Sequence, residues 1–360
     1  MSHRPDLGYR DEGWDLADPD FYSDAARVLP PAAFRSLNFT RLEDEAIWTR
    51  DWICVGSHES IPAVGDLLPF TVGTHGIHVQ RAEDGLQARF NKAQHGGCRT
   101  VPLQCQTGAK TRCSFTSCGY SRDRGAIPAG ELGDGTPEMH QYLGLRPERL
   151  LTAHVRSWGP LIFVNLDVAP TAPEPGFAAL NKAGRFFGNH KPTRSAERWL
   201  EFSANWKLLG QALAGGTPAG EEGEGNWIFA ETTLADGAPA VTAWLFPNLV
   251  LIATESETCA IVLQQTAIGR TLCRLCVYGE SDRLDDGRWT AEVETRAALA
   301  EAGHLDLARW ATSFRPETIG APRPLQSDVH GAWMQQALAR RVARIPQDDI
   351  EQPLFNNPRG

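Results

Sequence analysis

The chain has 360 residues, of which 42% are hydrophobic, and its formal net charge is -9. A chain of this length and apolar content can bury a sizeable core and is expected to divide into two domains. The acidic balance, with Lys and Arg scattered along the chain, excludes a basic surface for nucleic acid or for anionic lipid.

The sequence carries no sign of export or of membrane insertion. No apolar run approaches the roughly 20 residues that cross a bilayer, and the polar first residues are not typical of a signal peptide. Eight Cys in a chain this long do not make a disulfide framework. These properties predict a cytoplasmic protein with reduced thiols and no membrane contact.

The periodicity of the chain predicts its domains in order. Residues 1–50 are expected to form an N-terminal helical segment that packs on the C-terminal domain. In residues 51–167, short β-rich runs alternate with Gly, Pro and polar clusters, which predicts a β domain. In residues 168–360, longer strands alternate with a few helices, as an antiparallel sheet covered by helices requires. The fold class predicted for the whole chain is α+β.

Helical spacing is clearest between residues 289 and 310. There Val293, Ala297, Leu299 and Leu305 lie among Glu and Arg, which predicts a helix that covers the sheet.

The pair Cys273 and Cys276 has the spacing of a redox motif. No strand-to-helix turn accompanies it, and the alternation of the surrounding residues favours a strand. In a strand these two thiols point to opposite faces, so no chemistry is assigned to them.

An altered iron–sulfur motif follows the first predicted strands. Its two parts read AQH, from Ala93 to His95, and CSFT, from Cys113 to Thr116. They resemble the Cys-x-His and Cys-x-x-His pairs of Rieske nonhaem iron oxygenases, the ring-hydroxylating alpha-subunit family, in which two Cys and two His hold a two-iron, two-sulfur cluster. Ala93 and Thr116 replace one Cys and one His, so the resemblance implies a cluster site reduced to His95 and Cys113.

The mononuclear iron motif of the same family is altered as well. Residues 204–208, ANWKL, resemble the start of the family's catalytic helix. Counted on without a gap, the two His positions are Pro218 and Gly223, and neither residue can coordinate iron. The position of the carboxylate ligand is Asp328, for which capping of a helix is the alternative role.

The resemblance extends along the chain in order. Residues 41–81 resemble the family's first helix and the first strands of its Rieske domain, and residues 157–167 resemble the strand that closes that domain. Phe246-Pro247-Asn248 is the most specific part of a similar hairpin. The resemblance implies a Rieske-like β domain followed by a helix-grip domain.

The segment Ala214–Asn226 departs most from the family. Its thirteen residues include five Gly and one Pro, and relative to Ala each Gly costs a helix about 0.8–1 kcal/mol and each Pro about 3 kcal/mol. The helix is therefore expected to end near Leu213. The acids Glu221, Glu222 and Glu224 favour a solvated loop or lid after it.

Other metal sites fit the sequence poorly. Four Cys lie near His95, but six, seven and four residues separate them, whereas structural zinc sites use closer pairs; these Cys are Cys98, Cys105, Cys113 and Cys118. They are expected to pack as small hydrophobes. Iron held in another register stays an alternative, with His190, His304 and His330 as the downstream candidates.

The altered motifs predict a chain that carries no iron–sulfur cluster, no mononuclear iron and no other cofactor. The resemblance implies that active relatives pass electrons between neighbouring alpha subunits. The leading hypothesis is therefore a noncatalytic alpha-like subunit, which binds an active alpha paralogue in a trimeric or hexameric hetero-oligomer and stabilises or regulates it.

Two other classes of function stay open. A metal-free binding protein would hold an apolar small molecule in the helix-grip cavity, and the candidate cavity residues, each of which core packing also explains, are Trp206, Trp227, Phe229 and Trp244. A metal-independent enzyme would draw its acids and bases from Glu221, Glu222, Glu224, Asp328 and His330.

Overall fold

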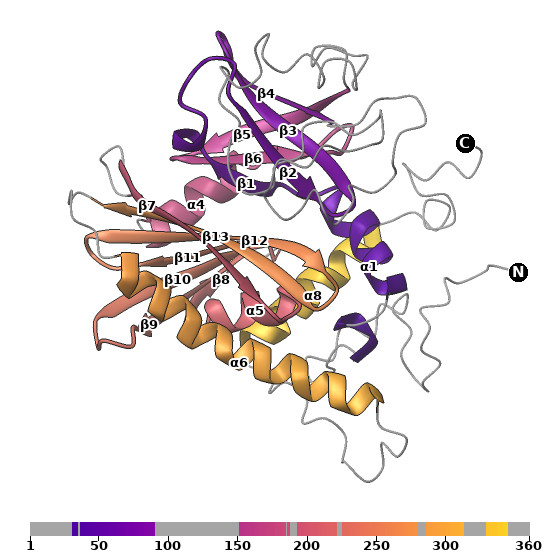
Figure 1. The fold of residues 1–360 in the computed structure, drawn as a ribbon, viewed down its shortest axis with the longest axis vertical. Helices are drawn as coiled ribbons and strands as arrows, with labels where there is room; N and C mark the ends of the chain where they lie inside the picture. The colour runs from indigo at the N-terminus through magenta and orange to yellow at the C-terminus, as the bar shows by residue number, and fades with distance from the viewer. Residues whose placement is uncertain are drawn as a thin grey trace, which may run out of the picture. The chain divides into compact units, whose positions relative to one another are not determined.

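The computed structural model describes residues 31–34, 37–90, 151–184, 186–187, 193–221, 225–279, 286–312 and 329–344. Contacts divide this part of the chain into two units, one from Trp48 to Ala172 and one that combines the residues before Trp48 with those from Pro173 onward. Each unit is built on its own antiparallel sheet (Figure 1). The predicted α+β class is confirmed.

The smaller unit is a six-stranded sheet with the strand order β1-β6-β5-β4-β3-β2. Its strands are β1 (Ile53–Ser57), β2 (Leu67–Val72), β3 (His75–Ala82), β4 (Gly85–Phe90), β5 (Thr152–Trp158) and β6 (Leu161–Asn165). β1, β2 and β6 are buried along their whole length, which their Val, Ile, Leu and Phe side chains favour. Gly159, with a φ of 54°, supplies the left-handed residue of the tight turn between β5 and β6.

The larger unit is a seven-stranded sheet with the strand order β7-β13-β12-β11-β10-β9-β8. Its strands are β7 (Thr193–Phe202), β8 (Thr217–Glu221), β9 (Trp227–Thr233), β10 (Pro239–Leu245), β11 (Leu249–Ala253), β12 (Glu257–Ala267) and β13 (Arg270–Gly279). From β8 to β13, successive strands are neighbours in the sheet, so this part forms by local hairpins. The Phe246–Asn248 segment, the most specific part of the predicted hairpin, joins β10 to β11.

The helices of the larger unit differ widely in length. They are α1 (Leu37–Glu43), α4 (Glu174–Gly184), α5 (Trp206–Leu213), α6 (Asp286–Thr312) and α8 (Val329–Arg344), with short helical turns at Pro31–Phe34 and Asp44–Trp48. Another short turn, His58–Ser60, belongs to the smaller unit. Among the described helices, none combines the length and the apolar character that a membrane crossing needs.

The two faces of the larger sheet carry different helices (Figure 1). On one face, Trp244 of β10 packs on Trp333 of α8, and its ring lies so close to Gly210 of α5 that an added Cβ would be 2.3 Å away. On the other face, Phe186 just after α4 packs edge-on against Phe229 of β9. Cross-strand pairing separates these faces, because Trp244 is opposite Ile228 whereas Phe229 is the next residue along β9.

The helix predicted from residue 289 to 310 is α6, and it covers the sheet with Trp289, Val293 and Ala297, all fully buried. Two of its predicted apolar contacts are wrong, because Leu299 is 71% and Leu305 is 53% exposed. The reason is angular: successive helical residues are about 100° apart, which turns Leu299 away from the stripe that Val293 and Ala297 define.

The prediction for Cys273 and Cys276 is confirmed. Both are buried in β13, and neither forms a disulfide. Cys273 is opposite Leu263 and Cys276 is opposite Ala260, so the two side chains lie on opposite faces of the sheet.

Candidate functional site

Asn205 caps the start of α5, the helix that begins with the family-like motif. Its Oδ1 accepts a hydrogen bond from the backbone N of Lys207 at 3.1 Å, which satisfies one of the free amides of a helix start. Its Nδ2 donates to the carbonyl oxygens of Ile268 at 2.9 Å and Phe34 at 3.4 Å. The Asn of the motif therefore fixes α5 to the β12–β13 turn and to the N-terminal segment.

Lys207 forms a buried ion pair with Glu43 of α1. The two side chains are 0% and 1% exposed, and the Nζ of Lys207 lies 5.1 to 5.4 Å from the ring centres of Phe34, Phe39 and Trp206. The indole Nε1 of Trp206 reaches the second oxygen of Glu43 at 3.5 Å. Burial raises the pKa of Glu43 and lowers the pKa of Lys207, and the charge of each partner opposes the shift of the other. Because no solvent reaches this pair, we assign it a structural role: it attaches the start of α5 to α1.

Arg296 of α6 holds the end of α5. Its Nη1 donates to the carbonyl oxygens of Leu213 and Gly215, both at 3.0 Å, and its Nη2 donates to Oγ1 of Thr232 at 3.1 Å. Carbonyls of a last helical turn lack an intrahelical donor, and a cation there also interacts favourably with the helix dipole. Glu292, one turn earlier on α6, accepts from Nε of Arg296 at 2.6 Å and orients the guanidinium. The predicted end of the helix near Leu213 is confirmed.

After α5 the chain continues as the edge strand β8, and not as the solvated loop that was expected. Thr217 pairs with Glu231 and Pro218 pairs with Ala230 of β9. Both β8 residues are exposed, and a Pro without an N–H is tolerated at such an edge. The expectation failed because Gly and Pro disfavour a strand locally, whereas pairing with β9 stabilises one.

Most of the metal-ligand positions lie outside the described residues. Of the three iron-site positions the structure describes Pro218, whose side chain has no donor atom, while Gly223 and Asp328 are not described. The remaining positions outside the described residues are Ala93, His95, Cys98, Cys105, Cys113, Thr116, Cys118, His190, Glu222 and Glu224. Within the described ranges, no three His, Cys, Asp or Glu side chains gather as metal ligands.

Two of the aromatic residues predicted to line a cavity belong to one buried cluster. Trp244 lies 5.3 Å from Trp333, and Phe246 lies 6.2 Å from Trp333 and 5.8 Å from Trp206, measured between ring centres. The guanidinium of Arg341 lies 4.1 Å from the ring centre of Phe246. Trp206 and Trp244 are therefore fully buried in a cluster of packed rings.

The other two, Trp227 and Phe229, lie on the opposite face of the sheet. They are two residues apart on β9, and each is 8% exposed. Their partners on β10 are Leu245 and Ala243. The structure thus separates the four predicted residues into two pairs, because a single sheet lies between them.

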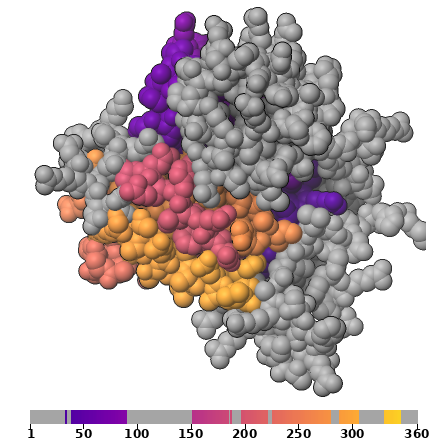
Figure 2. Space-filling view, viewed as in Figure 1, coloured from indigo at the N-terminus to yellow at the C-terminus, as the bar shows by residue number. Residues whose placement is uncertain are grey.

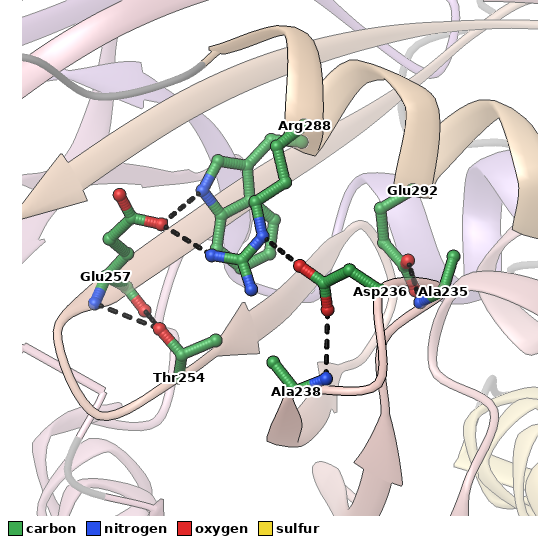
Figure 3. Close-up of polar contacts among 8 residues, drawn as sticks. Ala235, Asp236, Ala238, Thr254, Glu257, Arg288 and Glu292 are labelled. Carbon is green, nitrogen blue, oxygen red and sulfur yellow. Dashed lines mark hydrogen bonds and ion pairs between the residues drawn. The ribbon is translucent and has the colours of Figure 1, made fainter.

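The start of α6 carries a polar network that sequence reasoning missed (Figure 3). Arg288 Nε lies 2.7 Å from Oδ2 of Asp236, and Arg288 Nη1 lies 3.2 Å from Oε2 of Glu257. Trp289 Nε1 donates to the same Glu257 oxygen at 3.0 Å. A backbone hydrogen bond from Ala238 and the bond from Arg288 lower the pKa of the exposed Asp236.

The network continues along one face of α6. Glu292 Oε2 accepts from the backbone N of Ala235 at 2.8 Å (Figure 3), and its other oxygen bonds to Arg296. Arg288, Glu292 and Arg296 recur every four residues with alternating charge, and this spacing was the available sequence signal. The face joins the β9–β10 turn, the β11–β12 turn and the end of α5.

The smaller unit contains a Ser–His pair that the sequence did not suggest, since 99 positions separate its residues. His58 Nε2 lies 2.9 Å from Oγ of Ser157, and Arg81 Nη2 lies 2.9 Å from Nδ1 of His58. A guanidinium can only donate, so Nδ1 accepts and Nε2 carries the proton. His58 is then a donor to Ser157 and cannot remove its proton, which excludes a nucleophilic serine in this arrangement.

Relatives of the chain are oxygenase subunits. The glycine betaine monooxygenase oxygenase subunit of Pseudomonas aeruginosa (strain UCBPP-PA14) is 25% identical over 182 residues, which are 50% of this chain and 41% of that protein. Biphenyl 2,3-dioxygenase subunit alpha of Rhodococcus jostii (strain RHA1) is 25% identical over 220 residues, 58% of this chain and 45% of that protein. The matches thus span less than half of these relatives' lengths. No protein-family model matches the chain.

Solved structures share the fold at lower identity. The quaternary ammonium Rieske monooxygenase CntA in complex with gamma-butyrobetaine superposes with a TM-score of 0.61 at 17% identity, covering 92% of this chain and 99% of that one. Naphthalene 1,2-dioxygenase with indole in its active site gives a TM-score of 0.60 at 14% identity, covering 94% and 97%. At this identity the likeness establishes the fold.

The prediction of a chain without cofactors is wrong on this comparison. The relatives and neighbours are Rieske oxygenases, a kind of protein that carries a Rieske iron–sulfur cluster and a mononuclear iron. The prediction judged only the motif positions, whereas the chain has eight Cys and ten His in all. The resemblance behind it is confirmed: the relatives and structural neighbours of this chain are Rieske oxygenase alpha subunits, and its fold is theirs.

Proposed function

We propose that the chain is a noncatalytic alpha-type subunit that assembles with an active Rieske oxygenase alpha subunit and stabilises or regulates it. The assembly is a mixed trimer or hexamer in the cytoplasm, where buried thiols outside any disulfide, such as those of Cys54 and Cys259, stay reduced. The fold shared with alpha subunits supports this role, because subunits of one fold can present the same assembly surfaces.

The observation that carries the proposal is the path of the chain after α5. In the family motif, this stretch is a helix that presents two His to the iron. Here α5 ends at Leu213 and β8 follows. Counted along the sequence without a gap from the motif, Pro218 takes one of the His positions. Arg296 bonds to the terminal carbonyls, so the altered path is stabilised by the fold. The chain keeps the framework of an alpha subunit but changes the segment that would perform the chemistry.

Co-expression tests the proposal. The chain is produced with each active alpha subunit encoded in the same genome, and the products are analysed by native mass spectrometry and on a sizing column at micromolar concentration. We expect one paralogue to co-elute as a mixed oligomer and to gain thermal stability from it. The biphenyl dioxygenase alpha subunit of Rhodococcus jostii serves as a control for specificity. If every paralogue separates from the chain, the proposal fails.

An alternative function is supported by the cofactors of the relatives: an oxygenase that holds iron through donors outside the motif positions. Iron and acid-labile sulfide, measured with a visible spectrum on anaerobically purified chain, distinguish the two. A brown protein with iron and sulfide in equal amounts supports the oxygenase. A protein without iron and sulfide would contradict the oxygenase.

A further inference from the structure

We propose that His58 is a pH-sensitive switch in the smaller unit: when its ring gains a proton, the guanidinium of Arg81 on β3 leaves the short turn His58–Ser60 between β1 and β2. While the ring is neutral, the two side chains hold this turn against β3. All the groups involved lie within one unit of the chain, and the switch does not depend on the proposed role as a subunit.

The contact between the ring and the guanidinium is the first observation. Nη2 of Arg81 lies 2.9 Å from Nδ1 of His58. A guanidinium stays protonated in proteins and can only donate, so this bond requires a ring nitrogen that accepts. Nδ1 accepts only while the ring is neutral. A protonated ring would direct an N–H and a second positive charge at the guanidinium, so the attraction would become repulsion.

The same guanidinium also holds the backbone of the turn, which is the second observation. Nε of Arg81 donates to the carbonyl oxygen of Ile61 at 2.6 Å, and Nη2 donates to the carbonyl oxygen of His58 at 3.4 Å. Repulsion from a protonated ring would move the guanidinium away from these two oxygens as well. One proton therefore removes three contacts between β3 and the turn.

The contacts on the other side of the turn do not depend on the charge of the ring. Nε2 of His58 lies 2.9 Å from Oγ of Ser157 on β5, and this nitrogen is a donor in both the neutral and the protonated ring. The backbone N of His58 donates to the carbonyl oxygen of Pro160 at 2.9 Å. The switch therefore has a direction: the turn stays attached to β5 and to the β5–β6 turn and separates from Arg81.

Other charged groups lie on the elements around the ring. Glu59 follows His58 in the turn, and Asp66 precedes β2, where its carboxylate accepts from a backbone amide of its own loop. Arg156 lies on β5 and donates to a backbone oxygen of its own strand. The carboxylates favour a charged ring and the guanidiniums oppose it. Because Arg81 contacts the ring nitrogen directly, its repulsion determines the sign of the response.

NMR of the full chain tests the switch, with the His58→Gln variant to assign the ring signals. We expect the ring of His58 to titrate below the ordinary histidine value of about 6.5, because Arg81 disfavours the charged form. From pH 7.5 to pH 5.5, hydrogen exchange of the Ile61 amide, corrected for the intrinsic effect of pH, should accelerate at least about threefold. The Gly65 amide donates to the backbone oxygen of Arg81 and should not respond, so it is the internal control.

Two variants separate the charge of Arg81 from the other contacts of the ring, and circular dichroism checks that each is folded. Arg81→Gln offers a neutral donor, so His58 should titrate at a higher pH than in the wild type, and the acceleration at Ile61 should disappear. Ser157→Ala removes the bond that does not depend on charge and should keep the acceleration. Titration of His58 at or above about 6.5 in the wild type, an unchanged titration in Arg81→Gln, or equal acceleration at Ile61 and Gly65 would each overturn the proposal.

Discussion

The two ends of α5 differ in what fixes them. At the start, Asn205 and Lys207 follow the family-like motif and bond to Phe34, Glu43 and Ile268, residues far away in the chain. At the end, the helix stops at Leu213, and the next residues join the sheet as β8. The start is stabilised by buried partners, so a substitution of one of them leaves the others buried without their contacts. The end itself is buried at Leu213, but the β8 residues that follow, Thr217 and Pro218, are exposed and depend on pairing with β9.

The largest expected effect comes from the buried pair at the start. Lys207→Met should lower the free energy of unfolding by about 3–5 kcal/mol, because Glu43 stays buried without its counter-charge. Urea unfolding measures this value. The double variant Glu43→Leu/Lys207→Met should recover most of the loss, since it removes both charges. Replacement of Arg270, whose pair with Glu201 is exposed, is the matched control and should cost under about 1 kcal/mol.

Arg296→Gln tests the end of the helix. The carbonyls of Leu213 and Gly215 lose a charged donor, so we expect a loss of about 1.5–3 kcal/mol of unfolding free energy. Hydrogen exchange should accelerate in β8 more than at the start of α5. Arg288→Gln is the control, because Arg288 bonds to the turns and not to α5. If hydrogen exchange in β8 is equally fast in the wild type and in Arg296→Gln, Arg296 does not stabilise the end of α5 and the start of β8.

Two glycines allow a smaller, paired test. Gly210→Ala would place a Cβ 2.3 Å from the Trp244 ring, so overpacking should cost about 1–3 kcal/mol even though Ala is the better helix former. Gly220→Ala in β8 meets nothing within 4 Å and should change the stability by less than about 0.5 kcal/mol. Thermal unfolding of both variants measures the difference. A stabilised Gly210→Ala would show that α5 does not pack on Trp244 in this way.

The stability of the Glu43→Gln variant should change with pH, and the direction of this change tests whether Lys207 is buried. Burial lowers the pKa of Lys207 below its ordinary 10.5, and loss of the Glu43 charge removes what opposes this shift. Between the lowered folded-state pKa and 10.5, the unfolded state binds more protons, so the stability of Glu43→Gln should rise with pH by up to about 1.4 kcal/mol per unit. Urea unfolding at pH 7, 8.5 and 10 measures the slope. Glu43→Gln/Lys207→Met should not show it, and a falling slope in Glu43→Gln alone would contradict the burial of Lys207.

Local sequence predicted some of these features and missed others for physical reasons. The end of α5 near Leu213 was predictable, because the cost of Gly and Pro in a helix is local. The strand β8 was not, since it depends on pairing with β9. The sequence grouped Trp227 with Trp244, but only the strand register shows that they lie on opposite faces of one sheet.

In the site, too, local features were predictable from the sequence and distant partners were not. The spacing of the motif located Asn205 and Lys207 at the start of a helix, but the partner of Lys207 is 164 positions away, and no periodicity reveals it. His58 and Ser157 are likewise brought together only by the fold. Patterns of single residues predict elements, whereas partners across the chain require the tertiary structure.

Cross-linking of β8 to β9 tests most directly whether the chain after α5 forms a strand. Thr217 and Glu231 are exposed and directly opposite, at a separation that suits a disulfide. Thr217→Cys/Glu231→Cys should form a cross-link on mild oxidation, as should the control pair Thr233→Cys/Pro239→Cys between β9 and β10, read by peptide mass spectrometry. A cross-link in both variants is the predicted result. A cross-link in the control alone would mean that the chain after Leu213 does not pair with β9, and the account of this segment would be wrong.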